Sequence, residues 1–551
     1  MSKLHKKLAL VAATGLVAFG VSAIPAAAHA AAPQCATANY VQTCGGATSD
    51  GAPYAMMVPA NFNGTVFIYS HGYRYNVDIP AQIPLIGGYS VKKVLSTPQP
   101  APLPGNTDTT VIKALLGQGF AVMGSAFSTE GWNAGAAVAT DVELINAFKT
   151  QFPTTKKVVA WGESLGGFIT QALAESHPEL IDAAGLMCPA LGTVEAELTG
   201  AGDFLWGMKT FFDPSIRGHN YDAGAAGVQE AMGDLVKIFT VASKLQASMT
   251  TNAWPDTAGA AGTALAAIPP RSALLLVGLM AGIPTKSAHF DGTTGPGKKT
   301  DAAYTSFALA ASPALAVLEN GTQAAALAVL ATLDLEQQTG GAFYDNTKTD
   351  YQARVGSDLY SYNAALSGNT AVTGMLSFLN AANPAAPRWS ATAASVAKLR
   401  ALTAHTGTIT KPTIALAATS DPIVPAGNTQ WLVEKYAPQL EAAKAAAAKE
   451  AVATGKLVKA KQLFLPLWNN APASYTKFDS SGSPITSTPG VTGTGHCNFT
   501  ATQYIYMANM LAGATVTGNV NPTAALRTMA RKAGGAIDPS FVAPQLKFYQ
   551  N

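Results

Sequence analysis

The sequence predicts an α/β fold with a mostly parallel sheet flanked by helices and a large helical insert. Short β-branched or apolar segments alternate with helical patterns over residues 31–193, and this alternation returns over residues 410–551. Between them, residues 194–409 are rich in Ala and follow the helical period. The 551 residues also exceed what one compact core usually contains, which agrees with a core interrupted by an insert.

The first 30 residues have the pattern of a secretory signal peptide. Three lysines precede an apolar stretch over 8–24, and Ala28-His29-Ala30 is a small-residue cleavage site. We therefore expect cleavage after Ala30 and a secreted protein. An uncleaved membrane anchor is the alternative, but residues 31–34 provide no stop-transfer flank.

Charge and composition exclude several classes of partner. The signal segment holds three of the 35 basic residues and none of the 32 acidic ones, so the remaining chain has equal numbers of both. No basic face for nucleic acid is indicated. The longest later apolar run, 273–280, is too short to cross a bilayer, so we expect no stable membrane insertion. Only 12% of the residues are charged, which suits a neutral or apolar substrate, either a small molecule or a polymer. No His/Cys spacing suggests a metal site, and no cofactor is expected.

In the first part of the core, strands and helices alternate. A turn at 61–64 joins the first two predicted strands. In chain order, we expect strands at 54–58 and 65–69, a helix at 111–116, a strand at 120–124, a helix at 134–148, a strand at 157–161, a helix at 168–174 and a strand at 183–187.

The insert and the second part of the core follow. Within the insert, helices are expected at 228–245, 271–280 and 322–335, forming either a cap over the active site or a separate accessory domain. The α/β pattern then resumes. It predicts a strand at 411–417, a helix at 428–436, a charged solvated helix at 441–460, a strand at 462–465, a loop to residue 495 and a helix at 501–512.

The segment Gly162-Glu163-Ser164-Leu165-Gly166-Gly167 lies between a predicted strand and a predicted helix. In that context, G-x-S-x-G is typical of a sharp turn that raises a serine hydroxyl above the sheet edge. Glycines two places either side leave room for the strand and helix to cross. The helix N-terminus favours negative charge that develops there. We therefore predict that Ser164 is a nucleophile, the alternative being an ordinary Gly-rich turn.

A serine nucleophile needs a base and an acid that orients the base. Of the eight histidines, only His496 follows position 405, and it sits in a loop that leads into the last predicted helix. Asp421 comes after a late strand and before Pro422, between the serine and this histidine in the chain. The order Ser, Asp, His predicts that His496 is the base and Asp421 the acid. A turn-forming Asp before Pro and a loop histidine without a role are the alternatives.

An oxyanion hole is expected from backbone N–H groups. One is that of Leu165, which follows the nucleophile. The other belongs to Gly72 or Tyr73, because the strand at 65–69 runs into a His-Gly turn. His71 is interpreted as structural, since as a base it would stand in the wrong chain order.

These motifs together resemble those of secreted α/β-hydrolases of the serine esterase and lipase type. The resemblance covers residues 31–193 and 410–515 and implies the α/β-hydrolase fold with a Ser164, Asp421, His496 triad. Tannases and feruloyl esterases, which this chain echoes in part, join a Cys before the nucleophile to a Cys after the histidine. Here Cys497 follows His496, but Glu163 precedes Ser164.

Four cysteines, Cys35, Cys44, Cys188 and Cys497, remain after the signal segment and allow three connectivities. We predict Cys35–Cys44, closing a small N-terminal loop. The partial tannase-like pattern suggests Cys188–Cys497, which would hold the His496 loop over the sheet.

Four functions are compatible with these motifs. The sequence favours a secreted carboxylic-ester hydrolase that forms an acyl-enzyme on Ser164. A secreted serine exopeptidase is the alternative, with Glu163 as a possible anchor for a substrate amine. Acyl transfer to an alcohol would use the same triad, and a binding protein on an inactive hydrolase fold would not need all of these motifs.

Overall fold

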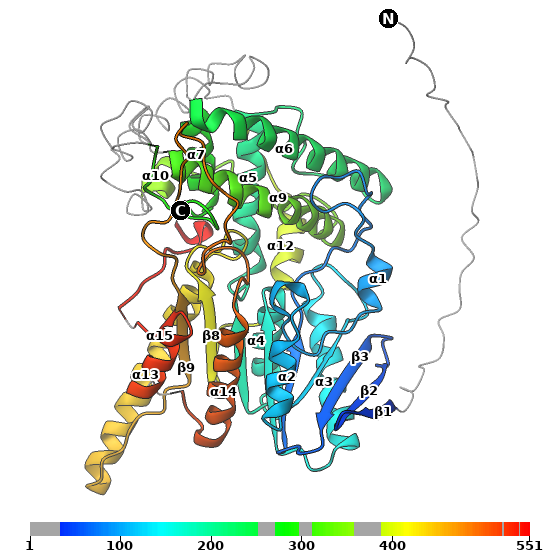
Figure 1. Cartoon of the computed structure of the whole chain (residues 1–551), viewed down its shortest axis with the longest axis vertical. Coiled ribbons are helices and arrows are strands. Elements are labelled where there is room, and N and C mark those ends of the chain that lie inside the picture. Colours follow the sequence, from blue (N-terminus) through cyan, green and yellow to red (C-terminus); the bar gives the residue numbers. More distant parts are fainter. Residues whose placement is uncertain are drawn as a thin grey trace, which may run out of the picture.

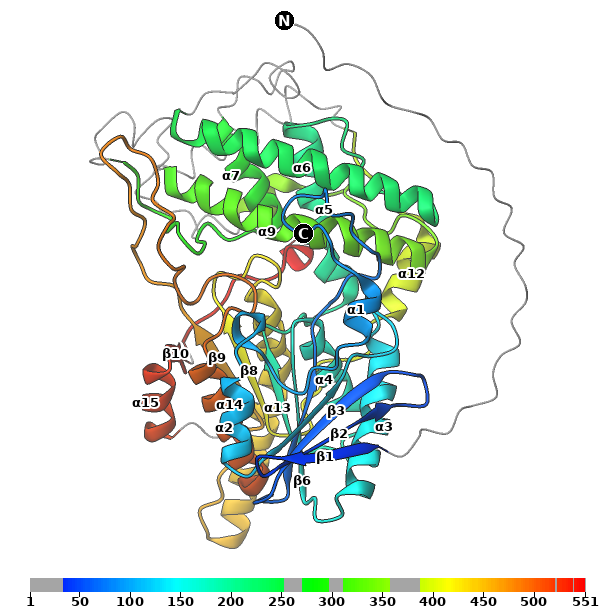
Figure 2. The same cartoon turned by 45° about the vertical axis from the view of Figure 1, so that its right-hand side comes forward.

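A computed structural model describes residues 33–251, 270–296, 311–356, 387–520, 523–538 and 540–550. The expected signal peptide lies outside these ranges. A sheet with helices on both faces forms one part of the molecule, and a group of helices lies beyond one end of its strands (Figure 1). Figure 2 shows the same two layers from a second direction.

The sheet has ten described strands in the order β1-β2-β3-β5-β4-β6-β7-β8-β9-β10. From β5 to β9 all neighbours are parallel, and the remaining pairs are antiparallel. The strands are β1 (Gln34–Ala38), β2 (Val41–Ala47), β3 (Pro53–Pro59), β4 (Thr65–Ser70), β5 (Ala121–Ser125), β6 (Lys157–Glu163), β7 (Ala183–Met187), β8 (Thr413–Ala418), β9 (Phe464–Asn469) and β10 (Gly535–Ala536). This mostly parallel sheet confirms the predicted fold class.

The predicted strands of the central sheet occur within a few residues of their expected limits, but three features differ. The turn at 61–64 does not close a hairpin, because β5 lies between β3 and β4. The N-terminal strands β1 and β2 were not predicted, nor was β10. The last long strand, β9, begins and ends later than the predicted range 462–465.

Alternating strand residues bury opposite faces of the sheet, as the two-residue period of a strand requires. Phe67 packs with the helices α2 (Thr110–Gly117) and α14 (Ala501–Thr517). Its neighbour Ile68 faces the other way, toward α3 (Ala134–Gln151) and α4 (Leu165–Ser176). The sheet is therefore covered on both faces, as expected for parallel strands.

The helix α13 (Gly427–Thr454) replaces two predicted helices, 428–436 and 441–460. It continues through Pro438, and its second half extends away from the sheet (Figure 1). The prediction ended the helix too late, because Gly455 adopts a left-handed conformation (φ 65°) and stops it. Lys444 and Glu441 pair on its exposed surface, as expected of a solvated helix.

The insert forms the second layer, above the carboxyl ends of the strands (Figures 1 and 2). The predicted helices at 228–245, 271–280 and 322–335 fall within α6, α7 and α9. Its described helices are α5 (Val194–Phe211), α6 (Ala225–Thr251), α7 (Pro270–Ala281), α9 (Ala311–Thr339), α10 (Tyr351–Gly356) and α12 (Ala393–Ala401).

The helix α9 is long and apolar enough to cross a membrane, which the sequence analysis did not anticipate. However, 72% of its most apolar window is buried inside the protein, where it packs against α5, α6 and α7. Burial among other helices is typical of the central helix of a helical layer.

Short elements complete the described chain. Two lie before β5 and two follow α14. They are α1 (Val91–Leu95), η1 (Pro104–Asn106), α15 (Ala524–Lys532) and the C-terminal η7 (Lys547–Gln550), which contacts α5 of the insert.

Candidate active site

Ser164 occupies a strained turn between β6 and α4. Its φ of 56° and ψ of −122° are rare for a residue with a side chain. A Cβ on Gly162 would lie 2.3 Å from the carbonyl oxygen of Gly166, and one on Gly166 would lie 1.9 Å from that of Ser70. Glycine is therefore required at both positions by the close approach of strand, turn and helix, as the motif predicted.

Asp421 and His496 come together although 75 residues separate them in the chain. The Nδ1 atom of His496 lies 2.9 Å from Oδ2 and 3.1 Å from Oδ1 of Asp421. Two backbone N–H groups, those of Ile423 and Val424, donate to Asp421 Oδ1, each at 2.9 Å. The carboxylate is buried and held in one orientation, so it can fix the ring of the histidine.

The environment of His496 favours its protonated form. Burial lowers the pKa of the imidazole, but the charge and hydrogen bond of Asp421 and the charge of Glu163 raise it more, so the net shift is upward. An imidazole with Asp421 on Nδ1 has Nε2 available to accept a proton. This is the arrangement a general base requires.

The contact between the serine and the histidine is not made in this structure. Among the described residues, Ser164 Oγ has no hydrogen bond to His496, whose Nε2 lies 3.5 Å from the Sγ atom of Cys497. The two segments are nevertheless neighbours. The N–H of Ser164 donates to the carbonyl of Met187 at 2.9 Å, and Cys188, the next residue, is bonded to Cys497. Such contacts commonly tighten only when substrate binds.

The three predicted oxyanion residues lie on two segments, the start of α4 and the loop after β4. Leu165 begins α4, so its N–H has no acceptor within the helix. A Cβ on Gly72 would lie 3.2 Å from Ser164 Cβ, which shows how closely the loop after β4 approaches the serine. The hydroxyl of Tyr73 donates to Asp334 of α9 at 2.9 Å, tying this loop to the insert.

His71 is unsuited to the role of base. Burial, together with the charge of Arg74, lowers the pKa of His71 to about 3. Its Nδ1 lies 2.8 Å from the carbonyl oxygen of Gly72, and its ring packs on Phe127. These contacts agree with the structural interpretation.

Both predicted disulfides are present. Cys35–Cys44 joins the adjacent antiparallel strands β1 and β2, where the two residues are direct partners. Cys188–Cys497 connects the end of β7 to the residue after His496. Cys188, His496 and Cys497 are the only group of potential metal ligands found in the described part of the chain, and two of them are used in this disulfide.

Glu163 is bonded to two tyrosines and is not among the residues that line the cavity, which argues against a role as the anchor of a substrate amine. Tyr69 and Tyr504 each donate a hydrogen bond to its carboxyl group from within the sheet and α14. Tyr504 also donates to the carbonyl of Cys497 at 3.2 Å. Burial raises the pKa of Glu163, although the two phenols oppose this shift. Glu163 is therefore connected through Tyr504 to the segment that contains His496.

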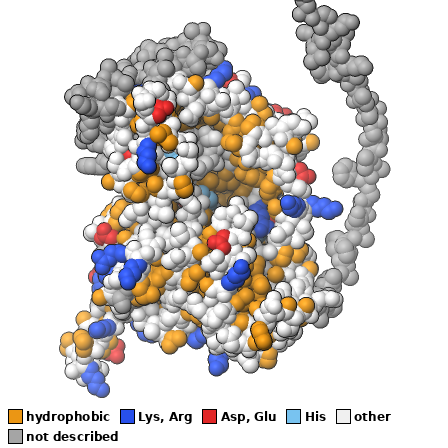
Figure 3. Space-filling model, viewed as in Figure 1, with side chains coloured by type: hydrophobic (Ala, Val, Ile, Leu, Met, Phe, Trp, Pro, Cys, Tyr) orange, Lys and Arg blue, Asp and Glu red, His pale blue; other side chains and the backbone are white. Residues whose placement is uncertain are grey.

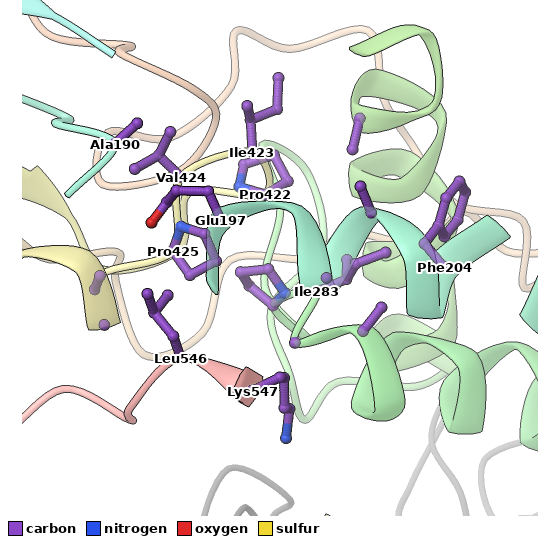
Figure 4. Close-up of a pocket in the computed structure, with 18 of the residues that line it drawn as sticks. Ala190, Glu197, Phe204, Ile283, Pro422, Ile423, Val424, Pro425, Leu546 and Lys547 are labelled. Carbon is purple, nitrogen blue, oxygen red and sulfur yellow. The ribbon is translucent and has the colours of Figure 1, made fainter. Parts of the chain in front are cut away.

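A cavity of about 400 Å³ opens in front of Ser164. Its walls come from the turn after Ser164, from α5, α7 and α9 of the insert, from 419–427 and from the C-terminal segment 541–547. Figure 3 shows hydrophobic side chains in the hollow between the two layers, and Figure 4 shows the lining of the cavity. Sequence reasoning missed the C-terminal wall and Glu197 of α5, which also lines the cavity.

One comparison with known protein families identifies the fold. A family model described as alpha/beta hydrolase fold matches residues 119–223, which include Ser164. No curated protein matches the chain. Three solved structures to which the chain is similar are esterases. An esterase from Aspergillus oryzae is 12% identical, with 88% of this chain and 81% of that chain covered and a TM-score of 0.39. Feruloyl esterase B from the same organism is 12% identical, with 83% of this chain and 73% of that chain covered and a TM-score of 0.32. The cell wall degrading esterase LipA from Xanthomonas oryzae is 12% identical, with 72% of this chain and 79% of that chain covered and a TM-score of 0.29.

Proposed function

We propose that this chain, which has the α/β-hydrolase fold, is a secreted serine hydrolase that cleaves carboxylic esters. The observation that carries the proposal is the pair formed by buried Asp421 and half-buried His496, together with the strained Ser164, which lines a cavity with mainly apolar walls. Charged side chains are few in this lining, which suits a neutral acyl or alcohol group.

In the proposed reaction, Ser164 Oγ attacks the acyl carbon of the ester. His496 Nε2 takes the hydroxyl proton and then gives it to the departing alkoxide, so that an alcohol leaves and an acyl-serine remains. Water then attacks the acyl-serine with the same base, releasing the carboxylic acid and restoring the hydroxyl. The N–H groups of Leu165 and of Gly72 or Tyr73 would stabilise the oxyanion in both steps.

The insert, residues 194–409, is proposed as a cap that forms much of the substrate cavity. Its helices α5, α7 and α9 contribute lining residues, which supports this role over that of an accessory domain. The proposed core is 31–193 with 410–551, and the proposed signal peptide is 1–30. Two disulfides support export to an oxidising compartment. The proposal includes neither a nucleic acid partner nor stable insertion into a membrane.

The test is a substrate screen with the purified mature protein. We expect turnover of p-nitrophenyl esters and none of aminoacyl anilides, which are substrates for the exopeptidase alternative. Ser164→Ala should lower ester turnover by several orders of magnitude and abolish labelling by a serine-directed phosphonate, with an unchanged melting temperature. Turnover of anilides alone would favour the peptidase, and labelling of the Ser164→Ala protein would overturn the nucleophile.

A further inference from the structure

The second half of α13 projects from the molecule with little support from the core. All but one of the buried residues of this helix lie at or before Tyr436, the exception being Ala447. The helix nevertheless continues to Thr454, and Figure 1 shows this part extending away from the sheet. Helices in proteins gain most of their stability by packing one face against other elements. Here six alanines between Glu441 and Glu450 supply high helix propensity instead, so the chain keeps a helix whose end is exposed.

The projection ends in residues 449–461, here called the α13 tip, which carry unusually exposed apolar side chains. Val452 is 87% exposed and Leu457 is 85% exposed, and they lie on either side of Gly455, where the helix ends. A single exposed Val or Leu is ordinary on a protein surface. Two of them beside one turn, at the end of a projecting helix, are typical of a surface that contacts a partner.

The same tip is basic. It contains four lysines and one acidic residue, Glu450, which gives a formal net charge of +3, although the chain after the signal segment has equal numbers of basic and acidic residues. The four lysines are all exposed: Lys449, Lys456, Lys459 and Lys461. Within the described ranges none of them forms an ion pair, whereas Lys444, just before the tip, pairs with Glu441 at 2.8 Å. Figure 3 shows both basic and hydrophobic side chains on the surface of this projection.

We infer that the α13 tip is a docking surface for a negatively charged lipid bilayer. Lysines close to an anionic bilayer gain electrostatic attraction, and exposed Val and Leu side chains gain by entering the interfacial region of the lipid. A soluble polyanion would attract the lysines but would offer nothing to Val452 and Leu457, so the combination favours lipid. Two apolar side chains support reversible adsorption and not insertion of the helix.

Docking through the tip leaves the cavity accessible. The helix α13 begins at Gly427, which lines the cavity, and its last residue lies about 40 Å away along the helix at 1.5 Å per residue. A bilayer at the tip therefore holds the protein at a membrane surface while the cavity receives substrates from solution. The inference does not depend on the proposed ester hydrolysis.

Cosedimentation of the mature protein with lipid vesicles tests the inference. The vesicles contain either phosphatidylcholine alone or equal parts of phosphatidylcholine and phosphatidylglycerol. We expect binding to the second kind only, and weaker binding as salt is added, because salt screens the attraction. Each lysine near an anionic surface contributes about fivefold in affinity, so Lys456→Gln with Lys459→Gln should lower the partition coefficient about thirtyfold. Val452→Ser with Leu457→Ser should lower it about tenfold and leave retention on heparin, a soluble polyanion, unchanged.

The matched control is Lys92→Gln with Lys93→Gln, which removes two exposed lysines from α1 and leaves the tip intact. This control should bind anionic vesicles as the wild type does, and all of these variants should keep the wild-type melting temperature because the altered side chains are exposed.

Three results would overturn the inference. The first is an equal loss of binding in the control and in the lysine variant of the tip, or equal or absent binding to the two kinds of vesicle. The second is undiminished vesicle binding by the Val452→Ser, Leu457→Ser protein, which would indicate a surface for polyanions. The third is self-association without lipid that this same variant abolishes, which would identify a second copy of the chain as the partner.

Discussion

Replacing Asp421 by Asn tests the triad through the chemistry of a single atom. In the structure, Asp421 Oδ1 accepts the N–H groups of Ile423 and Val424, while Oδ2 faces Nδ1 of His496 at 2.9 Å. An Asn that keeps its carbonyl on the two backbone donors must point its NH₂ group at the histidine. The Nδ1 atom must then accept, so the ring proton moves to Nε2, which can no longer take the proton of Ser164.

The alternative orientation of the Asn is also costly. Turning its carbonyl toward His496 would leave the N–H groups of Ile423 and Val424 facing an amide NH₂, and each unsatisfied buried donor costs about 1–3 kcal/mol. A loss on the order of 10⁴ in kcat, about 5 kcal/mol, is expected if the ring adopts the wrong tautomer. Because the turn keeps its hydrogen bonds in that case, the melting temperature should change little.

The pH profile adds an independent readout. The base works in its neutral form, so activity falls as the pH drops through the pKa of His496. The charge and hydrogen bond of Asp421 raise that pKa against the effect of burial. Removing them should therefore move the acid limb of the residual activity to lower pH.

A matched control is Asp479→Asn, since Asp479 also accepts two backbone N–H groups in a loop but is exposed and contacts no histidine. We expect this control to retain wild-type kcat and the wild-type acid limb. A loss of less than tenfold for Asp421→Asn, with an unmoved acid limb, would show that the pair does not act as reasoned here.

Three further predictions concern the surroundings of the triad. Reduction of Cys188–Cys497 should abolish ester turnover at a reductant concentration that leaves the melting transition intact, because this bond holds the residue next to His496. Loss of turnover and of the melting transition at the same reductant concentration would refute this prediction. Asp334→Ala should lower both kcat and the melting temperature, since it removes the acceptor of four hydrogen bonds, one of them from Tyr73; an unchanged kcat would limit Asp334 to stability. Phe204→Ala enlarges the apolar cavity and should shift the preferred p-nitrophenyl ester to a longer acyl chain, and an unchanged preference would place the acyl group elsewhere.

The parts of the fold that could be predicted are those with a strong local pattern. Central strands such as β7 (Ala183–Met187) are fully buried apolar runs, and their limits follow from the sequence. The strand β1 is exposed along its whole length and lacks such a pattern, so it was missed. The sequence predicted two helices, 428–436 and 441–460, where the structure has the single helix α13. This helix contains Pro438, but it is exposed there, so water can satisfy the carbonyl group that loses its partner.

The residues of the candidate site also fall into those that local motifs predict and those that depend on long-range contacts. Ser164, Asp421 and His496 could be proposed because their chain order and flanking elements are set by local motifs. Glu197 lines the cavity together with the distant segments 419–427 and 541–547, and no local pattern encodes that long-range arrangement. The same holds for Glu163, whose position in the motif suggested a substrate contact but whose carboxyl group accepts hydrogen bonds from Tyr69 of β4 and Tyr504 of α14, both distant in the sequence.

The insert is also hydrogen-bonded to two loops of the proposed active site. On α9, Asp334 Oδ2 accepts both the hydroxyl of Tyr73 and the N–H of Trp132 (2.8 Å), and so holds the loop for which we propose a part in the oxyanion hole. Asp291, another residue of the insert, accepts the backbone N–H groups of Tyr475 and Thr476, in the long loop that leads to His496.

Many hydrogen bonds lower the pKa of Asp291 despite its burial, so its carboxylate stays charged and these bonds stay strong. A displacement of the insert is therefore expected to disturb both the loop that contains Tyr73 and the loop that leads to His496. This coupling is the reason why Asp334→Ala, far from Ser164 in the sequence, is expected to lower kcat.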